Sequence, residues 1–164
     1  MDVWTLTQLE EIRVLKARYC RLCDTRQWDE LFALFTEDAV FGAPDAAPHD
    51  QQDEVSRAYR VGYTKGREAI RRTFVDMSDT VAEMVHKAHT PEIDLVSTDE
   101  AVGIWQLEDL FVFSGGPLRT MHGYGHYHDT YVRSDGRWRI ASSSVTRLHV
   151  DTVPADGAGA QDRR

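Results

Sequence analysis

Residues 10–41 read EEIRVLKARYCRLCDTRQWDELFALFTEDAVF. Apolar side chains recur in and just before this stretch at steps of three and four residues, which places them on one face of a helix. The positions on that face are Leu9, Ile12, Leu15, Tyr19 and Leu22. We expect the helix to be capped by Thr5 or Thr7 and to end near residues 24–26. A second, short helix is expected over residues 28–35.

The pattern of the chain changes twice after this segment. A short strand is expected at residues 39–41, and a third helix opens at Gly66. Its apolar face consists of Ile70, Phe74 and Met77. Beyond it the apolar period becomes that of strands, predicted at residues 92–95, 101–113, 121–133 and 137–150, with turns at residues 97–100, 114–117 and 134–136. Helices followed by an antiparallel meander indicate an α+β fold, in which helices pack on one face of a curved sheet that encloses a pocket.

The length of 164 residues fits a single domain. We expect residues 1–153 to form that domain, and residues 154–164, PADGAGAQDRR, to be a disordered tail. Residues 42–65 are polar, with two prolines early in the run. We interpret them as a loop with a helical turn around residues 55–59, of the kind that forms lids or binding loops.

The charge of the chain limits its partners. The formal charge is −8 and the isoelectric point is near 5.3. An acidic surface repels nucleic acid and anionic membranes, so we expect neither as a partner. The first residues, MDVWTLTQLEE, lack the basic start and apolar run of a secretory signal, and no stretch reaches transmembrane length. We therefore expect a soluble, cytoplasmic protein.

Three polar residues are candidates for chemistry, each with a structural alternative. Tyr19 lies on the apolar face of the first helix, where its hydroxyl either reaches a backbone group or serves a site. Asp24 follows at the end of that helix, where the helix dipole disfavours a carboxylate. It is either a solvated turn residue or one held there for a purpose. Arg147, in the last strand, can face a pocket, a carboxylate or solvent.

Several histidines raise the question of a metal site. His86 and His89 are three residues apart and so lie on opposite faces of a strand, which leaves only one to point into a pocket. His126 and His128 share a face, with His122 nearby, and form half of a metal site at most. We expect these side chains to be exposed or hydrogen-bonded, and we expect no metal.

The two cysteines, Cys20 and Cys23, have the C-x-x-C spacing of redox and zinc motifs. A zinc site needs a second ligand pair at matching spacing, and none is obvious. A redox motif usually follows a strand and opens a helix, whereas these residues come late in a helical pattern. We expect two ordinary buried or half-buried thiols.

Taken together, these segments resemble a known superfamily. Residues 10–41 resemble the opening helices of SnoaL-like, NTF2-like proteins, which implies a cone-shaped α+β domain. Three motifs resemble the bacterial bile acid 7α-dehydratases, namely Tyr19-x-x-x-x-Asp24 followed by Trp28-Asp29-Glu30-Leu31, then His86-x-x-His-Thr-Pro-Glu-Ile, and Leu107-Glu108-Asp109. Scytalone dehydratases are more distantly similar and share the aspartate and the first histidine. The resemblance covers about residues 10–150.

The resemblance implies a site made of Tyr19, Asp24, His86 and Arg147. In it, His86 would take a proton from carbon and return one to the departing hydroxyl, and Asp24 would hold the tautomer of the ring. Tyr19 would donate to the oxygen that gains charge. Arg147 would hold a carboxylate or coenzyme A ester of the substrate, or pair with Asp24. No metal or organic cofactor is implied. The second catalytic histidine of scytalone dehydratases has no counterpart near residues 110–111.

The implied function is dehydration of a hydroxylated, bile-acid-type 3-oxo-4-ene steroid. The same scaffold also carries ketosteroid-type isomerases and the small subunits of ring-hydroxylating dioxygenases. A further alternative is a non-catalytic binding protein, in which Asp24 and His86 would not touch. Relatives on this scaffold assemble through the sheet face. The resemblance favours a homotrimer, with Trp105 and Phe113 as candidate interface residues.

Overall fold

The computed structural model describes residues 2–42 and 63–155. Its first helix, α1, spans Val3–Asp24. Asp2 caps this helix, because its Oδ1 accepts a 2.8 Å hydrogen bond from the backbone N–H of Thr5. The cap therefore precedes the predicted Thr5 or Thr7. The predicted apolar face is confirmed, with Leu9 partly buried and four residues buried, which are Ile12, Leu15, Tyr19 and Leu22.

The second helix and the first strand meet earlier than predicted. Helix α2 covers only Trp28–Phe32, and strand β1, Phe35–Phe41, begins at the residue where we expected the helix to end. The reason lies in the last strand, β6 (Arg137–Pro154), which pairs in parallel with β1. The Ile140 N–H of β6 donates to the Leu34 carbonyl at 2.8 Å. Pairing with a distant strand thus overrides the local helical pattern.

The remaining elements keep the predicted order, but the end of the predicted loop forms a short strand, and the strand predicted at residues 92–95 begins at residue 81. They are β2 (Thr64–Lys65), α4 (Arg67–Ser78), β3 (Val81–Leu95), β4 (Glu100–Phe113) and β5 (Leu118–Ser134). Within the described residues, the strands form one sheet in the order β2-β1-β6-β5-β4-β3. Strands β3 to β6 make an antiparallel meander, and only the β1–β6 pair is parallel. The sheet is therefore mixed, and it stays open at β2 and β3.

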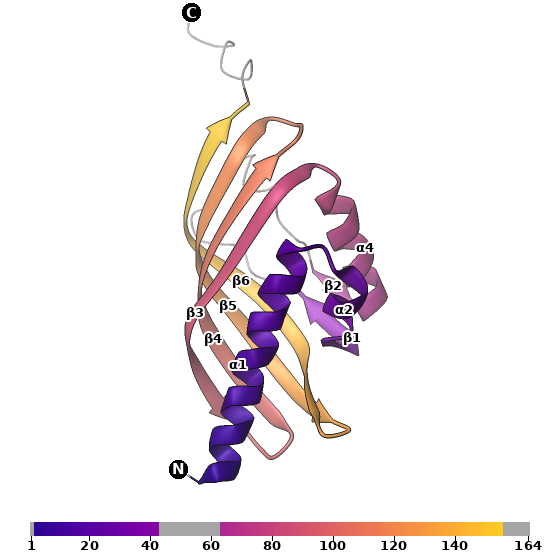
Figure 1. Ribbon diagram of the computed structural model, residues 1–164, viewed down its shortest axis with the longest axis vertical. Coiled ribbons are helices and arrows are strands. Elements are labelled where there is room, and N and C mark those ends of the chain that lie inside the picture. Colours follow the sequence, from indigo (N-terminus) through magenta and orange to yellow (C-terminus); the bar gives the residue numbers. More distant parts are fainter. Residues whose placement is uncertain (1, 43–62, 156–164) are drawn as a thin grey trace, which may run out of the picture.

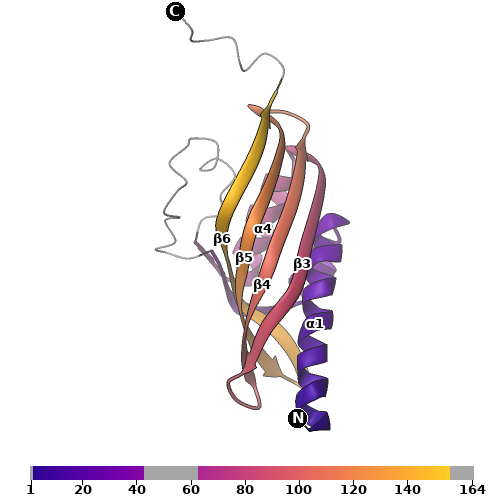
Figure 2. The same ribbon diagram turned by 90° about the vertical axis from the view of Figure 1, so that its left-hand side faces the viewer.

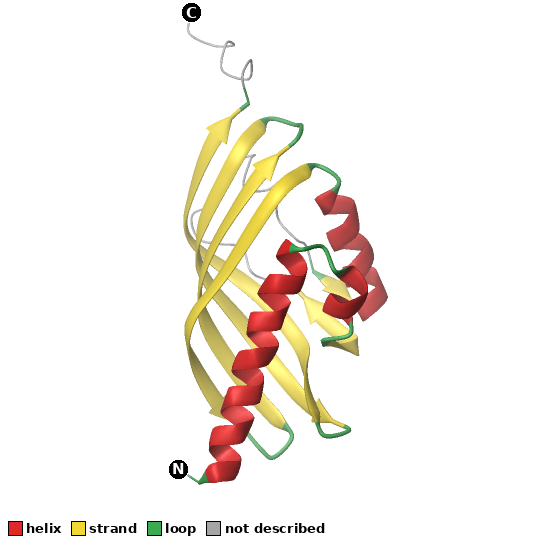
Figure 3. Ribbon diagram, in the orientation of Figure 1, coloured by secondary structure: helices red, strands yellow, loops and turns green. Residues whose placement is uncertain are grey.

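The helices lie on one side of this sheet. The long strands twist strongly along their length, and α1 crosses them diagonally (Figure 1). Colouring by element separates the helices from the curved sheet that they cover (Figure 3). When the molecule is turned by 90°, β3–β6 face the viewer and α4 lies behind them (Figure 2). This arrangement confirms the predicted α+β fold with helices on one face of a curved sheet.

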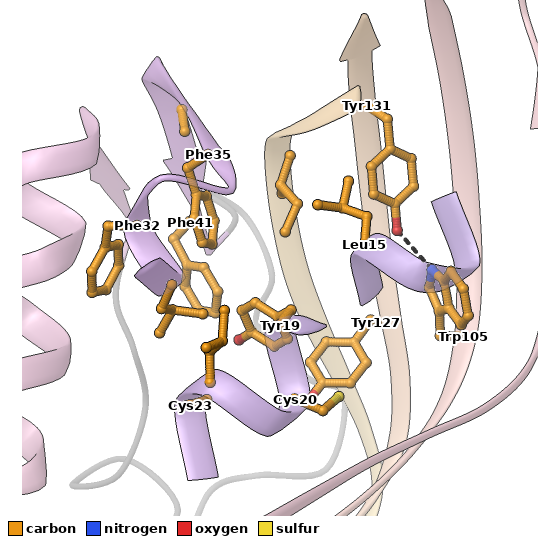
Figure 4. Packing of buried hydrophobic residues seen from close by; sticks show 14 of the residues in the cluster. Leu15, Tyr19, Cys20, Cys23, Phe32, Phe35, Phe41, Trp105, Tyr127 and Tyr131 are labelled. Atoms are coloured by element: carbon orange, nitrogen blue, oxygen red, sulfur yellow. Dashed lines mark hydrogen bonds between the residues drawn. The ribbon is translucent and has the colours of Figure 1, made fainter. Parts of the chain in front are cut away.

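The core fills the space between α1 and the concave face of the sheet. Tyr19 from α1 faces Tyr127 from β5, and Trp105 Nε1 donates a 2.8 Å hydrogen bond to Tyr131 Oη (Figure 4). Trp105 and Phe113 are 3% and 8% exposed. Because alternate residues of β4 point inward, both belong to the interior. The expectation that they lie on an outer interface is wrong.

Two predictions touch the limits of the described residues. The helical turn expected at residues 55–59 lies outside them, as does most of the predicted tail. Pro154, however, still belongs to β6, and the Ala155 N–H donates to the Pro117 carbonyl at 3.0 Å. The strand therefore continues past residue 153. Among the helices described, none combines the length and hydropathy needed to cross a membrane.

Candidate active site

Asp24 and His86 meet where the end of α1 lies against β3. His86 Nδ1 is 2.6 Å from Asp24 Oδ1. The backbone N–H of His86 also donates to both carboxylate oxygens, at 3.0 and 3.2 Å. These contacts hold the carboxylate at the helix end and orient the ring at the same time. A carboxylate on Nδ1 leaves Nε2 for proton transfer, as in a carboxylate–histidine pair that acts as a general base.

The charged form of His86 is favoured although the ring is nearly buried. The side chain of His86 is 9% exposed and that of Asp24 is 23% exposed. Burial by itself lowers the pKa of His86. The charge of the neighbouring Cys23, the hydrogen bonds of the ring with Asp24 and Cys23, and the charge of Asp109 outweigh this effect and raise the pKa from 6.5 to about 10. His86 is therefore an imidazolium at neutral pH.

His86 forms part of the wall of an apolar cavity with a volume of about 150 Å³. Aromatic side chains and methionines form most of this wall. The edge of His86 faces the ring of Phe111, with centroids 5.3 Å apart and planes at 87°. The polar side chains in the lining are Cys23, Ser78, Thr80 and His86. Among the described lining residues there is no lysine or arginine, so the cavity suits an uncharged ligand.

Arg147 pairs with Asp109 and not with Asp24. Its Nη1 and Nη2 donate to the two Asp109 oxygens, and both hydrogen bonds measure 2.6 Å. The Asp109 side chain is 3% exposed and that of Arg147 is 18% exposed. A planar guanidinium that meets a carboxylate in this bidentate way makes a strong, directional contact. Of the three contacts considered for Arg147, the structure thus supports the one with a carboxylate.

The backbone of the sheet makes room for this ion pair. Asp109 is the register partner of His86 in β3 and of Gly123 in β5. A Cβ at Gly123 would overlap both Arg147 and Asp109. One residue of β6 is skipped in the register, since Tyr124 and Gly125 pair with His149 and Arg147. This bulge at exposed Leu148 lets Arg147 face the interior.

Asp109 is a site residue that the sequence did not single out. Its motif, Leu107-Glu108-Asp109, supported the family resemblance only. A signal was nevertheless present, because strand alternation puts Asp109 on the inward face between Leu107 and Phe111. A carboxylate on an otherwise apolar face needs a partner. Asp109 lies opposite His86 on the neighbouring strand and also binds Arg147. It therefore links the Asp24–His86 pair to Arg147.

Tyr19 does not belong to the lining of the cavity. It is 2% exposed, and its ring packs edge-on against Phe35 and Tyr127. Burial and nearby Cys23 raise the pKa of Tyr19 well above 10. The tyrosine is therefore neutral. In the structure it is a residue of the hydrophobic core.

A second buried ion pair lies deeper in the cone. Lys16 Nζ donates to Asp129 Oδ2 at 2.8 Å, and both side chains are almost fully buried. Asp129 also accepts hydrogen bonds from Tyr131 at 2.8 Å and from Ser143 at 2.7 Å. The ammonium group lies 3.4 Å from the centroid of the Tyr127 ring. Lys16 lies four residues after Ile12 and three before Tyr19, so helical spacing places it on the inner face of α1, where a lysine is rarely buried without a partner.

The other histidines belong to the outer face of the sheet. His122 Nε2 lies 2.9 Å from Glu108 Oε1, and His89 Nε2 lies 3.6 Å from Glu108 Oε2. His128 Nε2 contacts Thr146 Oγ1 at 3.0 Å. In the described part of the chain, no group of three or more histidine, cysteine, aspartate or glutamate side chains is arranged to hold a metal ion. Cys20 and Cys23 are both free and buried, as predicted.

Known proteins share this architecture. The model of the SnoaL-like domain family matches residues 4–144. The probable cyclase FGR4 of Gibberella zeae is 25% identical over 137 residues, which cover 82% of this chain and 87% of that protein. A scytalone dehydratase-like protein of Novosphingobium aromaticivorans superposes with a TM-score of 0.77 at 21% identity, over 100% of this chain and 99% of that one. The hexachlorocyclohexane dehydrochlorinase LinA-type3 of Novosphingobium barchaimii superposes with a TM-score of 0.74 at 19% identity, over 96% of each chain.

At these identities the two solved structures show a common fold and no more. The family model, in contrast, runs from α1 into β6 and spans most of the chain. The chain belongs to the SnoaL-like domain family.

Proposed function

We propose that this protein is a lyase that eliminates water or a similar leaving group from a small apolar substrate by acid–base catalysis. The observation that carries the proposal is the 2.6 Å contact between Asp24 and His86 at the wall of an apolar cavity. In a purely binding protein we expected these two side chains to lie apart. Two of the proteins that share the fold are named as a dehydratase and a dehydrochlorinase, and both names denote eliminations, which supports this reaction class.

His86 acts as the base in this proposal. Asp24 holds the Nδ1 side of the ring, so Nε2 accepts the proton from the carbon next to the leaving group. The imidazolium that forms is stabilised by Asp24 and Asp109, which also raise the pKa of the ring. The same imidazolium then donates its proton to the departing oxygen. His86 thus takes up the proton from carbon and gives a proton to the departing oxygen, so the elimination needs no other proton donor.

Arg147 holds the Asp109 carboxylate in place. Both of its terminal nitrogens are engaged by the Asp109 carboxylate, so we assign it a positioning role. The earlier alternative, in which Arg147 binds a carboxylate or coenzyme A ester of the substrate, would require this ion pair to open. No lysine or arginine is among the described lining residues, and the charge of His86 is balanced by Asp24, which also favours a neutral substrate.

The cavity suggests the size of the substrate. An apolar cavity of about 150 Å³ holds a molecule the size of benzene. A four-ring steroid is larger than the part of the cavity that the described residues line. We therefore propose a single-ring substrate in which the C–H bond beside the leaving group is acidified by a carbonyl or halogen. The steroid predicted from the sequence becomes a competing substrate class in the test.

The test is a substrate screen read by absorbance. Cyclic β-hydroxy ketones, chlorinated cyclohexanes and 7-hydroxylated 3-oxo-4-ene steroids are incubated with the protein, and formation of the conjugated product or release of chloride is measured. We expect turnover of a single-ring substrate that is lost in His86→Gln and kept in His89→Gln, a matched change on the outer face. Turnover of the steroids alone would refute the size argument. Isomerisation of ketones that lack a leaving group, without any elimination, would refute the lyase.

A further inference from the structure

Cys23 is a polar group of the cavity that the proposed elimination does not use. It lies one residue before Asp24 on α1, and it lines the same cavity as His86. Its thiol donates a 3.9 Å hydrogen bond to Sδ of Met84, which belongs to the same lining. Cys23 from α1 and His86 from β3 therefore line one apolar space, and Asp24, which is not among the described lining residues, holds the ring of His86. A thiol, an imidazole and a carboxylate in this order are the components of an activated nucleophile.

The electrostatics of the three residues agree with this geometry. Burial lowers the pKa of His86, but the charge of Cys23 and its hydrogen bond with the ring are among the causes that raise this pKa to about 10. Asp24 completes the arrangement by holding the opposite ring nitrogen at 2.6 Å.

Cys20 provides an internal control in the same helix. It lies three residues earlier and is also free and buried, but it is not among the described residues that line the cavity. Burial raises the pKa of Cys20 to about 12. Its thiol is therefore protonated at neutral pH and inert. The two cysteines of the C-x-x-C sequence thus differ in their surroundings, although sequence alone makes them equivalent.

We propose that Cys23 is a nucleophile toward α,β-unsaturated carbonyl compounds that enter the cavity, with the Asp24–His86 pair as its acid–base partner. In the reacting pair, His86 Nε2 holds the proton that the thiol has given up, and the sulfur electron pair forms an S–C bond with the β-carbon of the acceptor. The π electrons of the C=C bond move to the α-carbon, which takes the proton back from His86. The net reaction adds S–H across the double bond, and no oxidant or reductant is needed.

Cys23 could also add to the product of the proposed elimination, and this possibility rests on the proposed function. Dehydration of a cyclic β-hydroxy ketone yields a conjugated ketone, which is an acceptor of this kind. Such a product would form within reach of Cys23 and would block the cavity if it added before leaving.

The experiment labels the full-length protein with 2-cyclohexen-1-one, followed by intact mass measurement and peptide mapping. We expect one adduct per chain on Cys23, formed at least about tenfold faster than any adduct on Cys20. Cys20→Ser should be labelled at the wild-type rate. His86→Gln should slow labelling of Cys23 by about tenfold or more, and His89→Gln should leave it unchanged. Asp24→Asn replaces His86→Gln if that variant does not fold.

Three results would overturn the proposal. They are equal labelling of the two cysteines, a Cys23 rate that does not respond to loss of His86 or Asp24, and labelling that occurs only in denaturant. The wild-type mapping decides the first and third results without any variant. Labelling needs no turnover, so a protein that forms the Cys23 adduct but eliminates nothing refutes the proposed function alone. A protein that eliminates but is never labelled refutes the thiol proposal alone.

Discussion

Arg147 and Asp109 form an ion pair that reaches across β5 at Gly123, with two hydrogen bonds of 2.6 Å each. Asp109 is also the register partner of His86. The Asp24–His86 pair and the Arg147–Asp109 pair therefore form one row of charged groups on a largely apolar face. Such a row is stable only when every member keeps its partner, because an unpaired buried charge costs several kcal/mol.

Replacement of Gly123 by alanine should disturb the site more than the fold. The new Cβ would overlap the ends of Arg147 and Asp109, which are side-chain atoms that can shift. We expect a loss of about 1–3 kcal/mol in the free energy of unfolding and a fall in kcat as Asp109 moves away from His86. Gly115→Ala is the matched control, because a Cβ there meets nothing within 4 Å. Equal behaviour of the two variants in urea unfolding and turnover would contradict this role of Gly123.

The two partners of the ion pair should not be equally costly to lose. Arg147→Ala leaves the 3% exposed Asp109 carboxylate without its cation, whereas Asp109→Ala leaves a guanidinium that is 18% exposed. We expect Arg147→Ala to lower the free energy of unfolding by about 3 kcal/mol or more and Asp109→Ala to lower it by less. Chemical denaturation of the two single variants and the double variant measures the difference. A larger loss for Asp109→Ala would show that the buried carboxylate is not the vulnerable partner.

The raised pKa of His86 predicts how stability changes with pH. A histidine in the unfolded chain has a pKa of about 6.5, and in the folded protein the pKa of His86 is raised to about 10. The folded state thus holds the proton more tightly. This contribution is fully present below pH 6.5 and is lost as pH rises through 10, by an amount on the order of a few kcal/mol.

Urea unfolding between pH 6.5 and 10 measures this effect. Other groups titrate in the same range, so the informative quantity is the difference between the wild type and His86→Gln, with His89→Gln as the control. We expect the advantage of the wild type to shrink as pH rises. A constant difference would mean that the pKa of His86 is the same in the folded and unfolded chains. The same pKa predicts that kcat/KM for the elimination rises with pH toward 10, because the base form is scarce below it.

Much of the fold could be predicted from local patterns. The apolar face of α1, the turns at residues 114–117 and 134–136 and the meander of long strands all follow from periodicity and from turn residues. The start of β1 at Phe35 could not be predicted in this way, because pairing with Ile140 decides it. Local patterns reflect only residues that are close in sequence, whereas this contact joins residues more than a hundred positions apart.

The site, too, could be predicted only in part. Family resemblance named Asp24 and His86, and their 2.6 Å contact agrees with that choice. The partner of Arg147 depends on the registers of three strands and on the bulge at Leu148, which no local pattern reveals. Lys16 and Asp129 are separated by 113 positions. Each looks like a surface residue until the fold brings them together in the core.

The most direct test of the account is single-turnover elimination by the wild type, Asp24→Asn, His86→Gln and the double variant, with the substrate identified by the screen. Calorimetry of a non-reacting analogue confirms that each variant still binds. We predict that each single change lowers the rate at least about 10²-fold and that the double change costs little more than the worse single one, because the two residues act as a unit. Full activity in either single variant, or losses that multiply in the double variant, would contradict the claim that Asp24 and His86 form one catalytic pair.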